Sequence, residues 1–185
     1  MRKLVVSEWV TLDGVFDAKT MKDWFMPFDS EDRQKHIKAG VVAADAFLLG
    51  KVTYKMLASY WSPLPDDAEG GLAGELNKTP KFVVSSKLKK ADWNNSTIIK
   101  DKVTREITKL KQQPGKEIQV IGSATLVQSL MKANLVDEFR FLVHPVIIGR
   151  GKPFFKDGMR TKGLELVSTK TLALGVMSLT YKPIK

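Results

Sequence analysis

The chain has 185 residues, a length common for one domain, and 43% of them are hydrophobic, which is enough for an ordinary core and argues against disorder. It contains no cysteine, which excludes disulfides, thiol catalysis and zinc–thiolate sites and fits a reducing cytoplasm. Lysine and arginine number 30 against 20 acidic residues, and this formal charge of +10 can attract nucleic acid, anionic membranes or phosphorylated small molecules.

The basic residues are spread along the chain, with small groups such as Lys87, Lys89 and Lys90. No basic run is interleaved with aromatic residues that could stack nucleic-acid bases, and no apolar run approaches the length of a membrane span. We therefore expect a solvated basic surface on a cytoplasmic protein, with one domain over residues 1–185 and neither a membrane nor a nucleic acid as partner.

The first predicted element is a strand over residues 2–10, where apolar and polar side chains alternate. Asp13-Gly14 then predicts a turn, because this pair favours positive φ. The aromatic cluster at 24–28 is expected to join the core. Ser30 is expected to cap a helix whose first turn is acidic.

A strand over 45–49, ending at Gly50, is followed by a helix over 51–60 with Val52, Met56 and Leu57 as its apolar residues. The composition of 61–71, rich in proline and glycine, predicts a loop that could flank a substrate. The elements expected next are a short helix, two strands and a helix, over 72–77, 81–85, 97–99 and 103–112.

The stretch from Glu117 to Phe155 predicts one βαβ unit. A short apolar strand over 118–121 ends at Gly122, Ser123 is a helix N-cap candidate, and Asn134 tolerates the left-handed conformation expected where the helix ends. A strand over 138–143 follows, and two further strands, over 164–172 and 176–181, form an antiparallel hairpin. The chain therefore predicts an α/β fold with a mainly parallel sheet, flanking helices and a C-terminal antiparallel hairpin.

Three groups of residues follow the expected carboxyl ends of strands, where ligands bind in such sheets. They are Gly50-Lys51-Val52-Thr53, Ser85-Ser86-Lys87 and Gly122-Ser123-Ala124-Thr125. The first amides of a helix lack partners within the helix and bind phosphate, although a glycine there can also serve only to make a tight turn. Together the three groups supply two helix starts, two lysines and several hydroxyls, which suits the phosphates of a dinucleotide.

The order of six motifs resembles that of a known family. These motifs are Thr11-Leu12-Asp13-Gly14, then Leu48 to Tyr54, Phe82 to Ser85, Val120 to Ser123, Leu135 to Glu138, and Pro145 to Phe155. They resemble the dihydrofolate-reductase-like superfamily, and within it the reductase domain of the riboflavin-biosynthesis deaminase–reductase and its free-standing bacterial relatives. The resemblance covers nearly the whole chain and implies the same fold and NADPH as cofactor.

The resemblance also implies roles for the residues at the strand ends. Gly50, Lys51 and Thr53 would meet cofactor phosphates, and Ser85, Ser86 and Lys87 would lie near the adenosine 2′-phosphate. Gly122, Ser123, Ala124 and Thr125 would hold the pyrophosphate, and Asp13 would lie in the loop over the nicotinamide. The stretch 54–61 lacks the acidic residue that the riboflavin reductase uses for its phosphoribosyl substrate. Riboflavin-pathway activity therefore does not follow from the resemblance.

The candidate proton donors are Asp13 and Glu138, and the alternative for each is structural: an Asx turn for Asp13, and a carboxylate at a strand start for Glu138. His36 and His144 lack partners at ligand spacing, so they are expected to be surface or packing residues, and no metal is expected. Two functions stay open. One is an NADPH-dependent reductase of a small pterin-, pyrimidine- or carbonyl-type substrate, and the other is a non-catalytic protein that binds nucleotides or nucleic acid.

A homodimer is expected from the C-terminal third. Phe139, Phe141 and Val143 occupy one face of a strand and Leu142 the other, and no helix is predicted after Phe155 to cover the second face. A twofold-related copy would cover it, because identical patches are self-complementary in such a dimer. The alternative is that the loop over 149–163 folds back as a lid and leaves a monomer.

Overall fold

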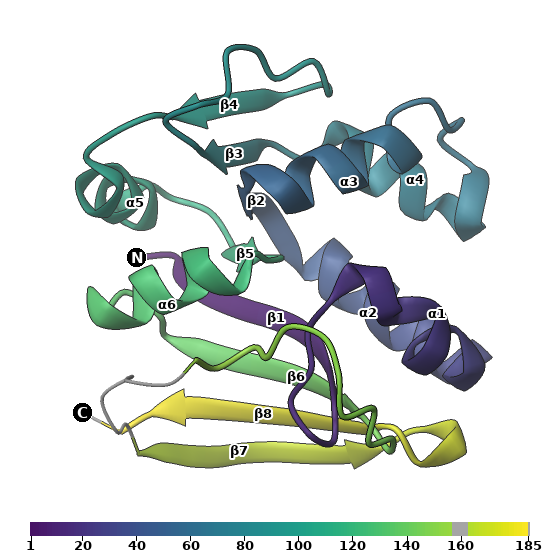
Figure 1. Cartoon of the computed structure of the whole chain (residues 1–185). Coiled ribbons are helices and arrows are strands. Elements are labelled where there is room, and N and C mark those ends of the chain that lie inside the picture. The colour runs from purple at the N-terminus through teal and green to yellow at the C-terminus, as the bar shows by residue number, and fades with distance from the viewer. Residues whose placement is uncertain (157–162, 185) are drawn as a thin grey trace. The chain divides into compact units, whose positions relative to one another are not determined.

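The computed structural model describes residues 1–156 and 163–184, which form an α/β fold with eight strands and flanking helices (Figure 1). Residue contacts divide the chain into two compact units, each built from two stretches of sequence. The first unit contains Met1–Val5 and Lys38–Val136, and the second contains Val6–Ile37 and Asp137–Lys185. Strand β1 (Lys3–Thr11) and helix α2 (Glu31–Ala43) have residues in both. The expectation of one domain stays a prediction.

The first unit alternates strands and helices. Its elements are β2 (Ala44–Gly50), α3 (Lys51–Trp61), α4 (Ala68–Lys78), β3 (Lys81–Val84), β4 (Ser96–Ile99), α5 (Val103–Gln112), β5 (Glu117–Val120) and α6 (Ala124–Lys132). The strands lie in the order β4-β3-β2-β5-β1, and β2 pairs in parallel with both β3 and β5. The parallel sheet predicted from the sequence is thereby confirmed, and the bounds predicted for α5 are those of the structure.

The start of α4 differs from the prediction. The sequence predicts a loop to residue 71 and a helix after it, whereas the structure begins α4 at Ala68. Glu69, Gly70 and Gly71 all have positive φ, so this first turn is not regular α-helix. The side chain of Lys38 donates to the carbonyl oxygen of Gly70 and ties this turn to α2.

An unexpected member of the first unit's core is Lys81, whose side chain is completely buried. Its ammonium donates to the carbonyl oxygens of Leu76, Asn77 and Thr79, at 2.6, 3.1 and 2.8 Å, and lies 4.4 Å from the centre of the Trp93 ring. Burial lowers the pKa of Lys81 to about 8, so the ammonium form still predominates at pH 7. The carbonyl groups at the end of α4 thus satisfy a charge that would otherwise be costly to bury.

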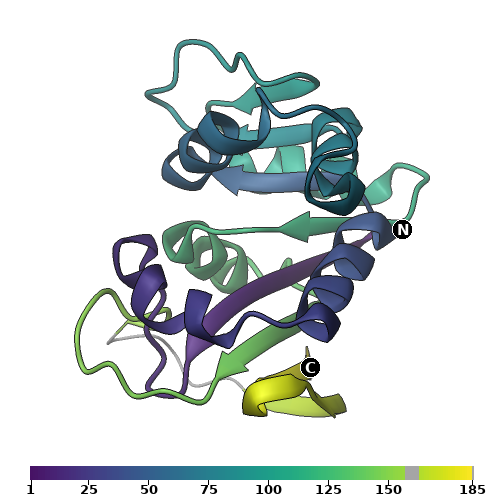
Figure 2. The ribbon, with the colours of Figure 1, turned by 90° about the vertical axis from the view of Figure 1, so that its right-hand side faces the viewer.

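The second unit contains an antiparallel sheet and several short helical turns. Its elements are η1 (Ala18–Thr20), α1 (Met21–Trp24), η2 (Met26–Phe28), β6 (Glu138–His144), β7 (Leu164–Thr171), η3 (Ala173–Gly175) and β8 (Met177–Pro183). The strands lie in the order β1-β6-β8-β7, and β8 is antiparallel to both β6 and β7. Figure 2 shows this C-terminal hairpin in yellow beside β6, as the sequence predicts.

Aromatic rings surround His144 in the core of the second unit. The rings of Trp24, Phe25 and Phe28 lie 5.3, 5.4 and 5.9 Å from the imidazole. Arg33 Nη1 lies 3.3 Å from His144 Nε2, and both side chains are buried. Burial lowers the pKa of His144 to about 4, which keeps the ring neutral at pH 7. The three aromatic rings of 24–28 therefore pack in the core around His144, which is a packing residue as expected, whereas Met26 of the same segment is exposed.

Strand β6 is covered on both faces within the chain, which corrects the argument that one of its faces lies open. Phe141 and Leu142 point to opposite faces, and both are buried. The rings of Phe154 and Phe155 lie 5.5 and 6.1 Å from that of Phe141, so the segment after β6 covers that face. This corresponds to the folded-back loop that the sequence leaves as an alternative, although 157–162 of that loop lie outside the described residues.

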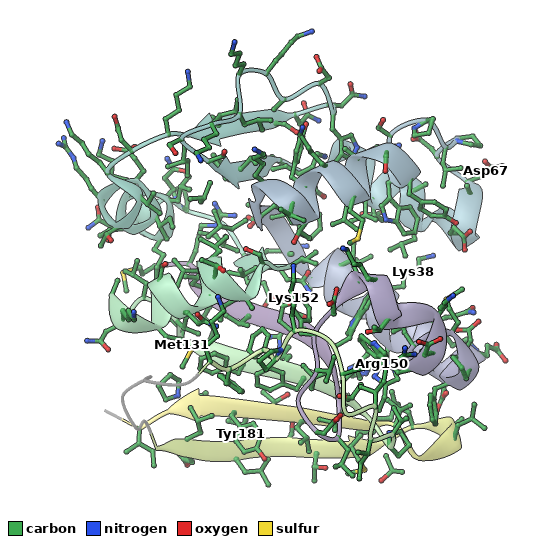
Figure 3. The ribbon with its side chains drawn as sticks, viewed as in Figure 1. Lys38, Asp67, Met131, Arg150, Lys152 and Tyr181 are labelled. Atoms are coloured by element: carbon green, nitrogen blue, oxygen red, sulfur yellow. The ribbon has the colours of Figure 1, made fainter. Side chains whose placement is uncertain are left out.

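Exposed apolar side chains occur instead on β7, the edge strand of the second unit. Leu166 is 52% and Val167 46% exposed, while Tyr181 on the neighbouring β8 (Figure 3) pairs with Leu166. None of the helices in the described part of the chain combines the length and the apolar character that a membrane crossing requires.

Candidate functional site

The three groups predicted from the sequence lie at the carboxyl ends of neighbouring strands in the first unit. Gly50, the last residue of β2, is the register partner of Val84, the last residue of β3. On the other side of β2, Leu48 is the partner of Val120, the last residue of β5. The segments that begin at Gly50, Ser85 and Gly122 therefore follow three adjacent strands at the same edge of the sheet (Figure 1).

The turns at Gly50 and Gly122 are in direct contact. The amide of Gly50 donates to the carbonyl oxygen of Gly122 at 3.0 Å. A Cβ atom at position 50 would lie only 2.6 Å from Ser123 Oγ, so glycine is needed there for space. Gly122 has φ of +60°, a region that glycine adopts without steric cost, and its peptide bond to Ser123 is cis. Helices α3 and α6 therefore begin at two turns that pack directly against each other.

Both helix starts lack a side-chain cap. Gly50 and Ser123 occupy the N-cap positions of α3 and α6, and neither makes a side-chain capping hydrogen bond. The prediction that the Ser123 hydroxyl caps α6 is therefore wrong, although Ser123 has the extended backbone of an N-cap residue. Because the first amides of a helix have no partner within the helix, the segments beginning at Lys51 and Ala124 both present N–H groups at this edge. The positive ends of two helix dipoles add to them.

The side chains of the three groups differ in exposure. Thr53 is buried in the first turn of α3, and Lys51 is half-buried. Ser85 Oγ accepts hydrogen bonds from the amides of Lys87 and Leu88, at 3.2 and 3.0 Å, which shapes the turn after β3. Ser86, Lys87 and Thr125, the second residue of α6, are exposed. The site thus offers Lys51 directly after Gly50 and Lys87 in the segment after the neighbouring strand β3.

In the second unit, Asp13 holds two loops together. Its Oδ1 accepts from the Thr11 hydroxyl at 2.5 Å, and its Oδ2 accepts from the amides of Ile148 and Gly149, at 3.2 and 2.8 Å. The Thr11 hydroxyl, and then the two amides, lower the pKa of Asp13. The carboxylate is therefore ionised at pH 7 and acts as an acceptor.

Further contacts join the same two loops. Val15 and Pro153 form an antiparallel bridge, and the amide of Phe154 donates to the carbonyl oxygen of Gly14 at 2.9 Å. Arg150, which is labelled in Figure 3, also forms an ion pair with Asp23 of helix α1 at 2.6 Å. These contacts link residues more than a hundred positions apart in the sequence, so no local sequence pattern predicts them.

Glu138, the other candidate proton donor, is buried at the start of β6. Its Oε1 lies 2.7 Å from Arg140 Nη2 and also accepts from Arg140 Nε at 2.7 Å. Across residues 1–156 and 163–184, no cluster of three or more histidine and acidic side chains is arranged to hold a metal ion. The His36 ring instead lies 3.1 Å from the Ser178 hydroxyl.

The apolar residues of α3 differ in burial. Val52 and Met56 are exposed, whereas Leu57 packs against the core. The helix buries Tyr54 as well, whose hydroxyl accepts from the backbone amide of Trp93 at 2.9 Å.

Comparisons with known proteins agree with this architecture. The family model of the RibD C-terminal domain matches residues 2–178. The chain is 32% identical over 182 residues to the uncharacterized protein YyaP of Bacillus subtilis, covering 97% of this chain and 94% of that protein. Among solved structures, a Shewanella sp. PV-4 protein named provisionally for riboflavin biosynthesis superposes with a TM-score of 0.80 at 19% identity, over 99% of each chain.

Dihydrofolate reductase from Enterococcus faecalis, solved in complex with NADP(H), superposes with a TM-score of 0.64 at 15% identity, over 98% of this chain and 97% of that one. At these identities the two solved structures show that the fold is shared. The family match and the Bacillus relative are similarities of sequence, and they show the family. The fold and the resemblance expected from the motifs are therefore confirmed, and the chain belongs to the RibD C-terminal domain family, a family of reductase type.

Proposed function

We propose that this protein is an NADPH-dependent reductase of a small pterin-, pyrimidine- or carbonyl-type substrate. The observation that carries the proposal is the meeting of two uncapped helix starts at adjacent strand ends, with Lys51 directly after Gly50 and Lys87 after the neighbouring strand β3. Membership of a reductase-type family supports it, as does the fold shared with a dihydrofolate reductase that was solved with NADP(H).

The residues at this edge fit a dinucleotide. The glycine at position 50 lets the Ser123 turn pack directly against it, and two sets of helix amides supply donors for phosphate oxygens. We assign the phosphates to Gly50, Lys51 and Thr53, and the pyrophosphate to the turn from Gly122 through Ser123 and Ala124 to Thr125. Ser85, Ser86 and Lys87 are assigned to the adenosine 2′-phosphate. NADPH would supply the hydride, and the protein would supply binding and orientation.

Asp13 and Glu138 are our proposals for the residues that assist the reaction. Asp13 is ionised and bound by the loop at 148–149, which suits a positioning carboxylate better than a proton donor. Glu138 is buried and accepts hydrogen bonds from Arg140, so it too is held in place by its neighbours. The proton that a reduced substrate takes up would then come from solvent.

The test is a titration of the purified protein with NADPH, followed by cofactor fluorescence, and then with each substrate class in turn. A reductase binds NADPH and oxidises it when a pterin, a pyrimidine or a carbonyl compound is added. Binding without oxidation across all three classes favours the alternative, a non-catalytic nucleotide-binding protein. Absence of binding to either NADPH or NADH refutes the proposal, because the two helix starts would then have no dinucleotide to hold.

We also propose that the protein forms a homodimer through β7. Among the strands of the described residues, β7 pairs only with β8, and its Leu166 and Val167 are exposed. An apolar edge strand is a template for a further strand unless it is covered, and a second copy offers the same strand.

A further inference from the structure

Helix α3 carries an exposed apolar stripe that neither the core nor the phosphate-binding turns explain. Val52, Met56 and Tyr60 are 75%, 42% and 52% exposed, and their spacing of four residues places them on one side of the helix. The opposite side packs against the core through Tyr54 and Leu57. The helix therefore has two apolar faces, of which only one is buried.

The stripe begins in the candidate cofactor site. Val52 lies between Lys51 and Thr53, in the first turn of α3, and Tyr60 follows eight residues later. At 1.5 Å per residue, the stripe extends about 12 Å away from the helix start. A molecule that lies against it would therefore be contiguous with a dinucleotide bound at the Gly50 turn.

The far end of the stripe is held in place. The Tyr60 hydroxyl donates to Glu69 Oε1 at 2.9 Å, and the Tyr60 ring packs edge-on against Trp61 with 4.9 Å between ring centres. The Glu69 carboxylate raises the pKa of Tyr60, so the hydroxyl stays protonated as a donor. The ring thus presents an apolar surface while its polar group is already engaged.

The charges on this part of α3 decide which ligand fits. Lys55 is the single charged side chain between Tyr54 and Trp61, and the side chain of Val52 has no hydrogen-bonding group while that of Met56 has only a weakly accepting thioether. A phosphorylated sugar needs several cations and donors for its phosphate and hydroxyl groups, and the stripe does not provide them. A flat ring system needs apolar contact, which a thioether and an aromatic ring supply well.

We propose that Val52, Met56 and Tyr60 form the wall against which the substrate lies, and that they select a planar, uncharged aromatic or heteroaromatic compound with a C=O or C=N bond. This inference rests on the proposed function, because it places the substrate beside NADPH. In the reaction, the carbon of that bond gains the hydride and the oxygen or nitrogen gains a proton from solvent. The cofactor leaves as NADP⁺.

The test measures binding to the protein saturated with NADP⁺, by ligand-observed NMR. The probes are lumazine, a planar uncharged bicyclic heterocycle, and ribose 5-phosphate. Met56→Ala and Tyr60→Ala are expected to weaken lumazine binding about tenfold or more while leaving the Kd for NADP⁺ within about twofold. Tyr60→Phe is expected to bind lumazine like the wild type, since it keeps the ring. Met26→Ala removes an exposed methionine of the second unit and serves as the control.

The outcomes separate this inference from the proposed function. A protein that does not bind NADP⁺ refutes both. A protein that binds NADP⁺ but not lumazine, or whose Met56→Ala and Tyr60→Ala variants bind lumazine normally, refutes only the substrate wall. Binding of ribose 5-phosphate that is lost in these two variants overturns the assigned substrate class.

Discussion

Replacing Gly50 by alanine tests the contact between the two glycine turns. Gly50 has φ of −76° and ψ of 155°, so alanine fits the backbone without strain. Its Cβ atom, however, would lie 2.6 Å from Ser123 Oγ, 3.1 Å from Ser123 N and 3.2 Å from Ser123 Cβ. Ordinary contacts begin at 3.4 Å, so the hydroxyl must retreat by the difference, 0.8 Å, or the whole turn must move.

The expected loss of NADPH affinity follows from the movement of helix α6, which begins at that turn. Helix α6 begins one residue after Ser123, so its first amides move away from a phosphate held between the turns. Losing one hydrogen bond to a charged group costs about 1.5–3 kcal/mol, which corresponds to a roughly 10- to 100-fold higher Kd for NADPH. Overpacking lowers the free energy of unfolding by about 1–3 kcal/mol, so the variant is expected to fold if the parent has ordinary stability.

The assay is a fluorescence titration with NADPH on four variants, each checked for folding by circular dichroism. Gly50→Ala is expected to bind weakly, and Gly50→Ala combined with Ser123→Ala is expected to recover part of the affinity, because the atom in closest contact is gone. Ser123→Ala alone completes the double-mutant cycle. Gly40→Ala is the matched control, since its Cβ would lie 3.8 Å from Gln119 Nε2. A folded Gly50→Ala protein with the wild-type Kd would show that this contact does not shape the cofactor site.

Three further predictions use other parts of the molecule. Lys87→Glu is expected to weaken NADPH about tenfold more than NADH, while Lys89→Glu changes both little; equal losses for the two cofactors place Lys87 away from the 2′-phosphate. Burial lowers the pKa of His144 from 6.5 in the unfolded chain to about 4 in the folded one. The neutral ring therefore stabilises the fold fully above pH 6.5, and this stabilisation is lost as the pH falls toward 4. Urea unfolding should then show a loss of about 3 kcal/mol over this window that is absent in His144→Gln; parallel curves for the two proteins contradict the assignment. Light scattering coupled to size exclusion should give twice the 20.7 kDa chain mass for the wild type and one chain mass for Leu166→Lys; a wild-type monomer at all concentrations rules out the dimer.

Much of the first unit can be predicted because its signals are local. The ends of α5 are marked by the sequence itself, and the strand–glycine–helix junctions at Gly50 and Gly122 repeat one pattern. Parallel strands bring their carboxyl ends to one edge, so the meeting of the three groups follows from assigning the strands correctly. Asn134 indeed ends α6 with positive φ, at +52°.

The misses have a common physical cause, which is that partners distant in sequence override local preference. A serine before a helix is usually its cap, but the side chain of Ser123 lies against the Gly50 turn instead. Asp13 before a glycine signals a turn, yet its strongest partners besides Thr11 are amides at 148–149. The exposed face of α3 could not be told from the buried one, because both faces are apolar.

The buried ammonium of Lys81 has a consequence for the register of strand β3. Side chains alternate between the faces of a strand, so a slip of β3 by one residue would turn Lys81 away from the three carbonyl oxygens that hold it. Burying a charge without partners costs far more free energy than misplacing an apolar side chain, so the slipped pairing is unfavourable. Ser85 and Lys87 lie four and six residues further along the same segment. The register that Lys81 favours for β3 therefore also determines where these two residues lie relative to Gly50. Lys81→Met should then leave the core filled but raise amide hydrogen exchange in β3, whereas unchanged protection there would show that the register is set by other contacts.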